Sequence, residues 1–474
     1  MDAYDLIVIG AGATGENVAD RATAGGLRVV IIEAELVGGE CSYWACMPSK
    51  ALLRSAAALR AAQRVSGARQ AITGELDVKA VLARRDKASH QWNDELQVEW
   101  LASAGVDLIR GIGRISGEKE VTVTHEDGSE FVLTAQHAVA VCTGTSARIP
   151  DISGLRDSQP WTSREVTSVQ EIHDRLAIMG GGVVGVEMAT AYAGLGAAVI
   201  LFARGGLLSG DEPFAGEMVK QGLEDLGAEV LLGVEATSVR RHDGLVTITM
   251  DDGSTITANE LLVATGRAPR THGLGLDAIG QHEVGLRDGD WIEVDDTMRV
   301  PGIDWLYAVG DVNHRALLTH QGKYQARAAG AVIAARARGE AVDHEPWSRF
   351  VATADRHAVP QVTFTDPEVA SVGYTEASAR KAGIDIRVID RDLGRVAGAS
   401  LHAGGYRGQV RMIVDENRKV IIGMTFVGQD VGELLHAATI AIVGEVPLDR
   451  LWHAVPAYPT MSEIWLRLFE EYRG

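Results

Sequence analysis

The sequence predicts an α/β fold with two copies of one strand–turn–helix–strand unit and a separate α+β domain after them. A glycine-rich turn directly follows a short apolar strand at residues 10–15 and again at residues 180–185. Each turn leads into a helix and then a second apolar strand, which is the order found in units that bind a dinucleotide at the helix N-terminus. From about residue 346 the pattern changes to strands mixed with helices, and the strands are expected at 361–364, 409–414 and 420–426.

The first unit has the residues that a dinucleotide-binding turn requires. Gly10 makes the turn after the strand Tyr4–Ile9. Gly12 lets a pyrophosphate approach the backbone, and Gly15 lets the helix pack closely on the sheet. The next strand ends at Glu33, about twenty residues further on, where a carboxylate suits a pair of ribose hydroxyls. The sequence therefore predicts a first dinucleotide site here.

The second unit repeats this turn with Gly180, Gly182 and Gly185. Its second strand ends in Arg204 rather than in an acid, and an arginine there can pair with a 2′-phosphate. This favours NADPH, with NADH as the alternative. Gly210 stands where some families have a second arginine, and Arg204 can also be interpreted as an ordinary surface charge.

Two cysteines, Cys41 and Cys46, follow a pair of glycines and precede Pro48. Proline suits the first turn of a helix, and the Ala-rich segment 51–63 supplies that helix. A helix N-terminus favours a thiolate, so the pair is interpreted as a redox-active dithiol. A structural disulfide remains an alternative, whereas a metal site is disfavoured because no second Cys or His pair stands at ligand spacing.

Two dinucleotide units and a redox dithiol indicate one flavin and one nicotinamide. Electrons would pass from the nicotinamide to the flavin and then to the disulfide. The chain resembles the flavoprotein disulfide reductases of class I, the pyridine nucleotide-disulfide oxidoreductase family that includes dihydrolipoamide dehydrogenase, glutathione reductase and mercuric reductase. Further segments similar to family motifs are 141–145 with Gly144, 264–269 with Gly266, 308–311 with Asp311, and 364–373.

The resemblance implies two Rossmann-like domains, one inserted in the other, and a dimerisation domain. Residues 1–150 and 270–345 would bind FAD, residues 151–269 would bind NADPH or NADH, and residues 346–474 would form the interface of a homodimer.

The resemblance also implies roles for individual residues. Cys41 would be the thiol that attacks the substrate, and Cys46 would form a charge-transfer complex with the flavin. Lys50 and Glu187 match a pair placed near the flavin N5, and Asp311 matches the residue that holds the ribityl chain.

The C-terminal segment departs from the family. Tyr458 stands where members that reduce organic disulfides have a general-base histidine, and a phenol is a poor base at neutral pH. Glu463 is kept, and in the family both positions face Cys41 of the other subunit. His453, five residues upstream, is either a displaced base or a surface or core histidine. Dihydrolipoamide dehydrogenase and glutathione reductase activities are therefore in doubt.

Two other features bear on the substrate. No cysteine follows Cys142, which is expected to be an inert core thiol, so the C-terminal cysteine pair that mercuric reductase needs is missing. Tyr43 and Trp44 lie between the redox cysteines and indicate either an aromatic or apolar substrate or simple packing.

Composition limits the remaining classes. The net charge of −19 argues against binding to nucleic acid or anionic membranes. No apolar run reaches the ~18 residues that span a membrane. Three cysteines, two of them a redox pair, fit a reducing cytoplasm.

The leading hypothesis is an NADPH-preferring, FAD-dependent oxidoreductase that acts on a sulfur group. It would reduce a small disulfide or similar soft electrophile through Cys41–Cys46. The alternatives are a diaphorase that reduces quinones or metal ions directly from the flavin, and a redox-sensing flavoprotein with little turnover.

Overall fold

The computed structural model describes residues 4–279 and 286–474. The flavin-binding domain expected from the sequence also contains residues 1–3 and 280–285, which lie outside the described residues.

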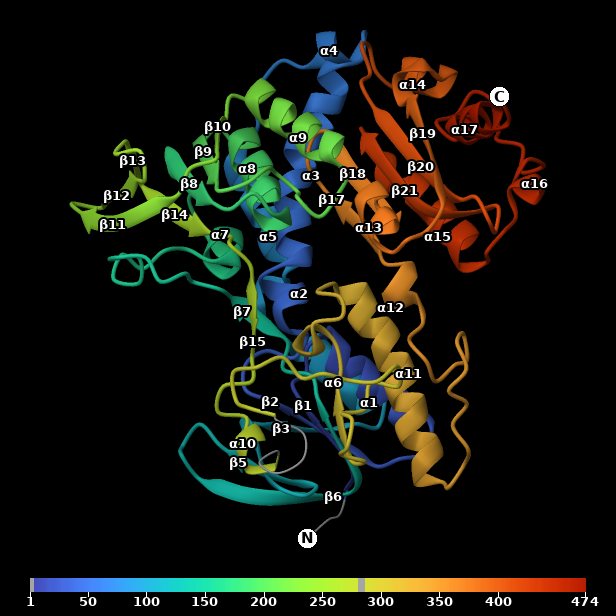
Figure 1. Cartoon of the computed structure of the whole chain (residues 1–474). Helices are drawn as coiled ribbons and strands as arrows, with labels where there is room; N and C mark the ends of the chain where they lie inside the picture. Colours follow the sequence, from blue (N-terminus) through green and yellow to red (C-terminus); the bar gives the residue numbers. More distant parts are fainter. Residues whose placement is uncertain (1–3, 280–285) are drawn as a thin grey trace. The chain divides into compact units, whose positions relative to one another are not determined.

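The chain packs into two compact units, each built from several segments (Figure 1). The first contains the chain up to Pro48, Asp86–Ala147 and Arg267–Arg356. The second contains Ser49–Arg85, Arg148–Gly266 and His357–Gly474. The first dinucleotide-binding unit is therefore interrupted by the second, as the sequence predicts. The boundaries of the three expected domains remain predictions.

The first unit is built on a mixed sheet in the order β3-β2-β1-β6-β5-β4, with β16 beside β6. Its parallel part consists of β1 (Tyr4–Ile9), β2 (Val29–Glu33), β3 (Asp107–Arg110), β6 (Glu130–Val141) and β16 (Leu306–Ala308). The antiparallel edge consists of β4 (Ile112–Gly117) and β5 (Glu120–Thr124).

Strand β1 is almost wholly buried, which is typical of a central parallel strand covered on both faces. Two helices, α1 (Ala13–Ala24) and α11 (Thr319–Ala337), pack side by side over one core of this sheet (Figure 1).

The second unit contains a parallel sheet, a small three-stranded antiparallel sheet within residues 236–258, and a larger antiparallel sheet. Its parallel sheet has the order β10-β9-β8-β14, and α8 (Val183–Gly194) follows β8. A five-stranded antiparallel sheet in the order β17-β18-β21-β20-β19 forms its C-terminal part. The strands of the parallel sheet are β8 (Arg175–Met179), β9 (Ala198–Ala203), β10 (Glu229–Leu232) and β14 (Glu260–Val263). Those of the five-stranded sheet are β17 (Pro360–Thr363), β18 (Glu368–Gly373), β19 (Ile386–Asp392), β20 (Gln409–Asp415) and β21 (Val420–Gly428).

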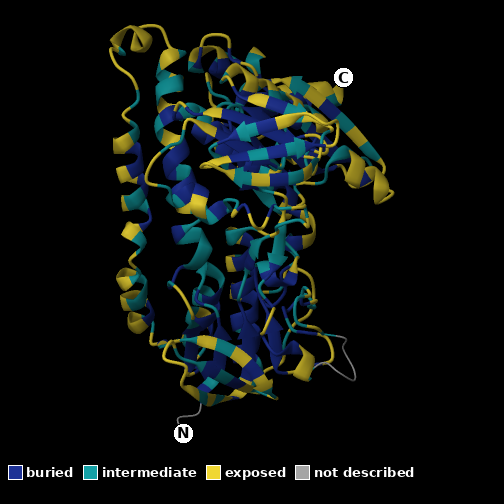
Figure 2. Cartoon of the chain, turned by 90° about the vertical axis from the view of Figure 1, so that its left-hand side faces the viewer, coloured by how far each residue is buried: buried dark blue, intermediate teal, exposed yellow. Residues whose placement is uncertain are grey.

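The helix expected over segment 51–63 is confirmed, and the chain stays largely helical from Cys46 to Ser103. This segment contains α3 (Cys46–Gln63), the short exposed α4 (Ala68–Ala71), α5 (Val78–Ala88) and α6 (Glu95–Ser103). Leucines of α3 and α5 join the core around α8 within the second unit. Figure 2 shows buried residues concentrated in the interior of each unit, while outer strands and helices carry exposed residues. In the part of the chain that the structure describes, no helix combines the length and apolar character that crossing a membrane requires.

Candidate active site

The first glycine turn leaves no room for a side chain at Gly10 and Gly15. Gly10 has a φ of +100°, and a Cβ there would lie 2.6 Å from the carbonyl oxygen of Cys142. A Cβ at Gly15 would lie 1.9 Å from the carbonyl oxygen of Gly10. At Gly12, in contrast, a Cβ would meet nothing closer than 4.0 Å, and no side chain caps α1. The N-terminus of α1 is therefore open to an anion such as a pyrophosphate.

Glu33 lies beside this turn, at the end of β2. Its Oε2 accepts a hydrogen bond from the Ala11 N–H at 2.6 Å, and its Oε1 accepts one from the Glu35 N–H at 2.8 Å. Burial raises the pKa of Glu33, and these two hydrogen bonds act against the rise. The backbone thus holds the carboxylate at the position that the motif assigns to a ribose.

A second polar cluster in the first unit surrounds Asp311. The Thr145 hydroxyl donates to its carboxylate at 2.8 Å, and burial raises the pKa of Asp311. Gly144 has a φ of +70° and nothing within 4 Å of a Cβ built on it. The hydroxyl oxygen of Thr143 is buried and has no hydrogen-bond partner within the described chain. An orphaned hydroxyl beside a buried carboxyl and an open glycine fits a bound polar cofactor such as FAD.

The second glycine turn repeats the geometry of the first. Gly180 has a φ of +120°, and a Cβ at Gly185 would lie 2.0 Å from its carbonyl oxygen. Gly182 starts α8 with open space around it and no side-chain cap. Arg204 follows β9, is 84% exposed, and lies 3.4 Å from Glu235. Gly266, expected in the second site, has a φ of +125°.

The redox cysteines lie on a loop that packs against the first glycine turn. Cys41 belongs to the short helix α2 (Gly39–Tyr43), and Cys46 begins α3. Gly38 pairs with Gly12, and a Cβ at Gly39 would lie 2.8 Å from the Gly12 Cα. The two glycines before the dithiol are therefore needed for this close approach.

The two thiols share a hydrogen bond. It raises the pKa of Cys41 well above its usual range, and burial adds to this effect, whereas Thr319 and the charge of Lys323 oppose it. The Cys46 sulfur also lies 3.4 Å from the Thr319 hydroxyl oxygen. The hydrogen bond and burial therefore favour the protonated form of Cys41.

In the second unit, Lys50 and Glu187 form an ion pair at 2.7 Å. The Glu187 side chain is only 4% exposed, and its other oxygen accepts from the Phe364 N–H at 3.0 Å. Glu187 is therefore a buried helix residue whose carboxylate is held by an ion pair and a backbone hydrogen bond. The pairing agrees with the expectation from the family, while its place beside a flavin remains a proposal.

Burial decides between the two interpretations of Tyr43. Tyr43 is fully buried, its hydroxyl donates to the Val37 carbonyl at 3.0 Å, and Trp92 donates to its own carbonyl at 3.1 Å. Burial, with the nearby charges of Asp94 and Glu16, raises the pKa of Tyr43 to about 12. Tyr43 thus packs the loop and does not present itself to a substrate. The expectation for Cys142 is confirmed, since it is buried and burial raises its thiol pKa.

The C-terminal residues have different surroundings. Tyr458 is 77% exposed, and His453 is exposed as well. Glu463 is 7% exposed, pairs with Arg467 at 2.6 Å, and accepts from the Ala397 N–H at 3.3 Å. Arg467 is therefore the ion-pair partner of Glu463 in this chain, which has no histidine at position 458. Among the residues that the structure describes, no group of three His, Cys, Asp or Glu side chains could hold a metal ion.

Sequence reasoning missed Thr319, which contacts the Cys46 sulfur, and Lys323, whose charge acts on Cys41. The available signal was weak: Thr319 and Lys323 stand four residues apart, so they share a face of α11. Nothing in the sequence shows that this face meets the cysteines.

The fold and the site define a dinucleotide-dependent dithiol oxidoreductase. Two family models match the chain: "Pyridine nucleotide-disulphide oxidoreductase" over residues 4–332, and its dimerisation domain over residues 359–468. The chain belongs to this family, and it is a class I flavoprotein disulfide reductase whose cofactors are FAD and NAD(P)H. The dimerisation domain supports a homodimer.

Curated relatives agree with this assignment. A mercuric reductase of Acidithiobacillus ferrooxidans is 33% identical over 97% of this chain and 80% of that protein. A dihydrolipoyl dehydrogenase of Thermus scotoductus is 32% identical over 98% of this chain and 96% of that protein.

Solved structures share the fold. The copper(II) complex of RclA, an HOCl-induced flavoprotein disulfide reductase of Escherichia coli, has a TM-score of 0.84 at 22% identity and covers 99% of this chain and 100% of its own. LpdA of Mycobacterium tuberculosis has a TM-score of 0.82 at 24% identity, covering 98% of this chain and 99% of its own.

Proposed function

We propose that this enzyme uses NADPH and FAD to keep Cys41 and Cys46 reduced, and that Cys41 then reduces a small disulfide or a similar soft electrophile. The observation that carries this proposal is the hydrogen-bonded thiol pair on a loop packed against the first glycine turn. When bound, FAD supplies a two-electron carrier between the nicotinamide and the Cys41–Cys46 disulfide.

The residues that would hold the cofactors follow from the two turns. In the first unit we assign FAD binding to Gly10, Gly12, Gly15, Glu33, Gly144 and Asp311. In the second unit we assign NAD(P)H binding to Gly180, Gly182, Gly185, Arg204 and Gly266.

NADPH is the preferred donor in this proposal because Arg204 is highly exposed at a strand end. Its contact with Glu235 is long, so the guanidinium is available to a 2′-phosphate. Lys50 would present its ammonium to the flavin, and the buried carboxylate of Glu187 would keep that ammonium in place. Few cysteines, two of them reactive, support a reducing cytoplasm as the compartment.

The chemistry of the dithiol balances without any further group. As Cys41 attacks one sulfur of the acceptor disulfide, the sulfur–sulfur bond of the acceptor breaks, and the first thiolate leaves and takes up the proton that Cys41 loses. Cys46 then attacks the Cys41 sulfur, so that the second thiolate leaves and a Cys41–Cys46 disulfide forms. The acceptor gains two electrons, the cysteines lose two, and their two protons go to the released thiolates.

We further propose that Tyr458 and Glu463 of one subunit face Cys41 of the other. The exposure of Tyr458 supports this, because its hydroxyl is available to a partner. A phenol is a poor base at neutral pH but a good hydrogen-bond donor. The acceptor should therefore release a thiolate that needs little protonation. A monomeric variant should then lack disulfide reductase activity.

The test is Cys41→Ser, with Cys142→Ala as the matched control that removes a thiol outside the site. We expect Cys41→Ser to abolish disulfide reduction and Cys142→Ala to retain it. Anaerobic treatment with NADPH followed by iodoacetamide should label Cys41 and Cys46 only after reduction. Equal turnover by Cys41→Ser and wild type would overturn the proposal.

A second candidate is a diaphorase that passes electrons to quinones or metal ions directly. The relatives named mercuric reductase favour it, although the C-terminal cysteine pair is missing from this sequence. Retention of quinone or metal reduction by Cys41→Ser would support this candidate.

A further inference from the structure

The turn between α5 and α6, residues 89–94, has an unusual backbone. His90, Gln91 and Trp92 have φ values of +48°, +54° and +55°, so three residues in a row lie in the left-handed region. None of them is a glycine, and this region is unfavourable for a residue with a Cβ. Such a run persists only where the surrounding structure holds it, and it is typical of segments with a functional role.

The 89–94 turn places the Trp92 indole against the dithiol loop, residues 38–46. The indole N–H donates to the Tyr43 carbonyl oxygen at 3.1 Å. Tyr43 is the last residue of α2, and the last carbonyl groups of a helix have no N–H partner within that helix. Trp92 therefore caps the short helix that carries Cys41, at the point where the chain turns toward Cys46.

The same turn holds the chain just before the dithiol loop. The Tyr43 hydroxyl donates to the Val37 carbonyl oxygen at 3.0 Å, and both side chains are fully buried. The Val37 N–H donates to Oδ2 of Asp94 at 2.7 Å. The Arg110 guanidinium donates to the same oxygen at 2.6 Å, which fixes that carboxylate. The turn thus restrains the loop at its entry and again between the two cysteines.

These restraints bear on how easily the dithiol closes. Cys41 and Cys46 are free thiols in this structure, and they share a hydrogen bond. Closing the disulfide brings the two sulfur atoms to about 2.05 Å. A loop that is already held with its sulfur atoms in contact loses little conformational freedom in this step, whereas a loose loop must first be ordered.

We propose that Trp92 and Tyr43 are positioning residues that set the reduction potential of the Cys41–Cys46 disulfide. By holding the loop, they raise the effective concentration of one thiol at the other and so stabilise the disulfide against reduction. Neither residue supplies an atom to the reaction. This inference rests on the proposed function, because it concerns the redox poise of the same dithiol.

The test measures the equilibrium between dithiol and disulfide in anaerobic glutathione buffers, with FAD-loaded enzyme and no NADPH. The sulfur–sulfur bond of glutathione disulfide breaks and the Cys41–Cys46 bond forms. Glutathione disulfide gains the two electrons that the dithiol loses, and the two glutathione thiolates take up its two protons. Acid stops the exchange, and N-ethylmaleimide then labels the free thiols of the denatured protein. By mass, the disulfide form has one labelled thiol, Cys142, and the dithiol form has three.

Trp92→Phe keeps an aromatic ring but removes the N–H that the Tyr43 carbonyl accepts. We expect the effective concentration to fall about fivefold, which makes the potential about 20 mV less negative for a two-electron couple. Tyr43→Phe removes only the hydroxyl and should lower the effective concentration about threefold, in the same direction. Trp347→Phe removes an exposed indole elsewhere in the first unit, and this control should match the wild type.

The inference is overturned if Trp92→Phe has the effective concentration of the control or a higher one. A lower Tm of this variant with an unchanged effective concentration has the same meaning, because it shows a merely structural contact. If Trp92→Phe does not fold, Tyr43→Phe decides, and an unchanged value there counts against the inference.

The proposed function fails separately. A wild type that keeps three labelled thiols at every glutathione ratio has no Cys41–Cys46 disulfide, and both proposals are then wrong. A wild type that forms the disulfide, with variants that do not shift it, leaves the proposed function in place and removes only the inference.

Discussion

The ion pair between Lys50 and Glu187 permits a quantitative test within the second unit. Lys50→Met removes the ammonium and leaves the Glu187 carboxylate with the hydrogen bond from the Phe364 N–H. Glu187→Leu removes the carboxylate instead, and the double variant removes both charges. These four proteins form a double-mutant cycle, which isolates the energy of the pair.

The expected magnitude follows from the exposure of the two side chains. Breaking a fully buried pair costs about 3–5 kcal/mol, whereas exposed pairs contribute about 0–1 kcal/mol. Glu187 is 4% exposed but Lys50 is 36% exposed, so solvent screens one side of the pair. We therefore expect Lys50→Met to lower the free energy of unfolding by about 2 kcal/mol. The double variant should be less destabilised than the sum of the single variants by about 1–2 kcal/mol.

The assay is thermal unfolding at saturating FAD, so that cofactor release does not enter the comparison. A loss of about 2 kcal/mol corresponds to a decrease in Tm of roughly 5 °C for a unit of this size. Lys79→Met, which removes an exposed charge from α5 in the same unit, serves as the control and should change Tm by less than about 1 °C. The reasoning is refuted if Lys50→Met matches this control, or if the two single effects add without coupling.

Four other predictions concern separate parts of the molecule. Gly15→Ala should abolish FAD retention, whereas Gly185→Ala should weaken NADPH binding with FAD retained. The reason is that the new Cβ would lie about 2 Å from the carbonyl oxygen of Gly10 or of Gly180, respectively. Flavin absorbance and the KM for NADPH distinguish the two effects. Arg204→Ala should raise KM for NADPH about tenfold and leave KM for NADH unchanged, and equal effects on both would indicate a plain surface charge. In the native reduced protein a thiol reagent should modify two of three cysteines, and Cys142 should react only after denaturation. Folding raises the pKa of Glu16 from 4.5 to about 7, so protonation of Glu16 stabilises the folded state. This contribution to the free energy of unfolding, at most about 3 kcal/mol, is fully present below about pH 4.5 and is lost as the pH rises through 7. Urea unfolding at pH 5 and pH 8 should therefore show a smaller pH dependence in Glu16→Gln than in wild type.

The local features were determined by the sequence because their cause is local. A glycine at positions 10 and 180 is required by a positive φ, and the spacing to Gly15 and Gly185 is set by one helical turn. Strand β1 begins and ends where the apolar run does. The redox pair could be found for the same reason, because five positions and a helix start bring its sulfur atoms together.

Contacts between distant segments were decided only by the tertiary structure. The sequence offers two interpretations for Tyr43, and burial against Val37 and Trp92 decides for packing. Glu463 keeps its family position, yet its partner is Arg467. No sequence pattern predicts these contacts, because the partner of a side chain depends on how helices and strands pack together.

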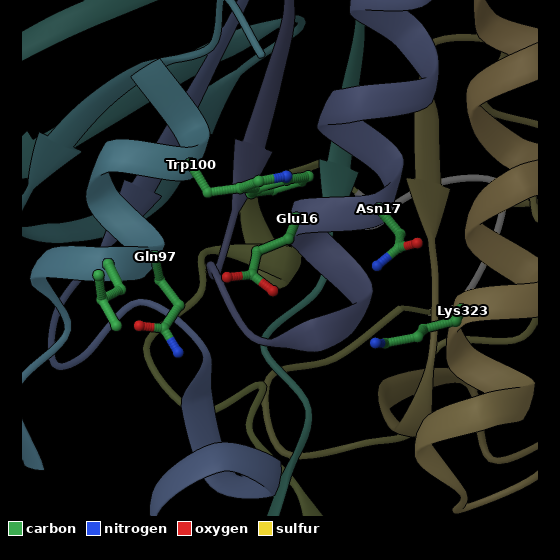
Figure 3. A pocket seen from close by; sticks show the side chains of 6 residues that line it. Glu16, Asn17, Gln97, Trp100 and Lys323 are labelled. Carbon is green, nitrogen blue, oxygen red and sulfur yellow. The ribbon is translucent and has the colours of Figure 1, made fainter. Parts of the chain in front are cut away.

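The cavity lined by α1, α6 and α11 shows the same limit most clearly (Figure 3). Glu16, Gln97 and Lys323 come from three helices separated by up to about 300 positions, and each is an unremarkable polar residue in its own segment. Periodicity and motif spacing describe what one segment requires of its own backbone. The desolvation of Glu16 arises only when the helices pack, and so do the buried oxygens of Glu16 and Gln97 that have no hydrogen-bond partner within the described chain.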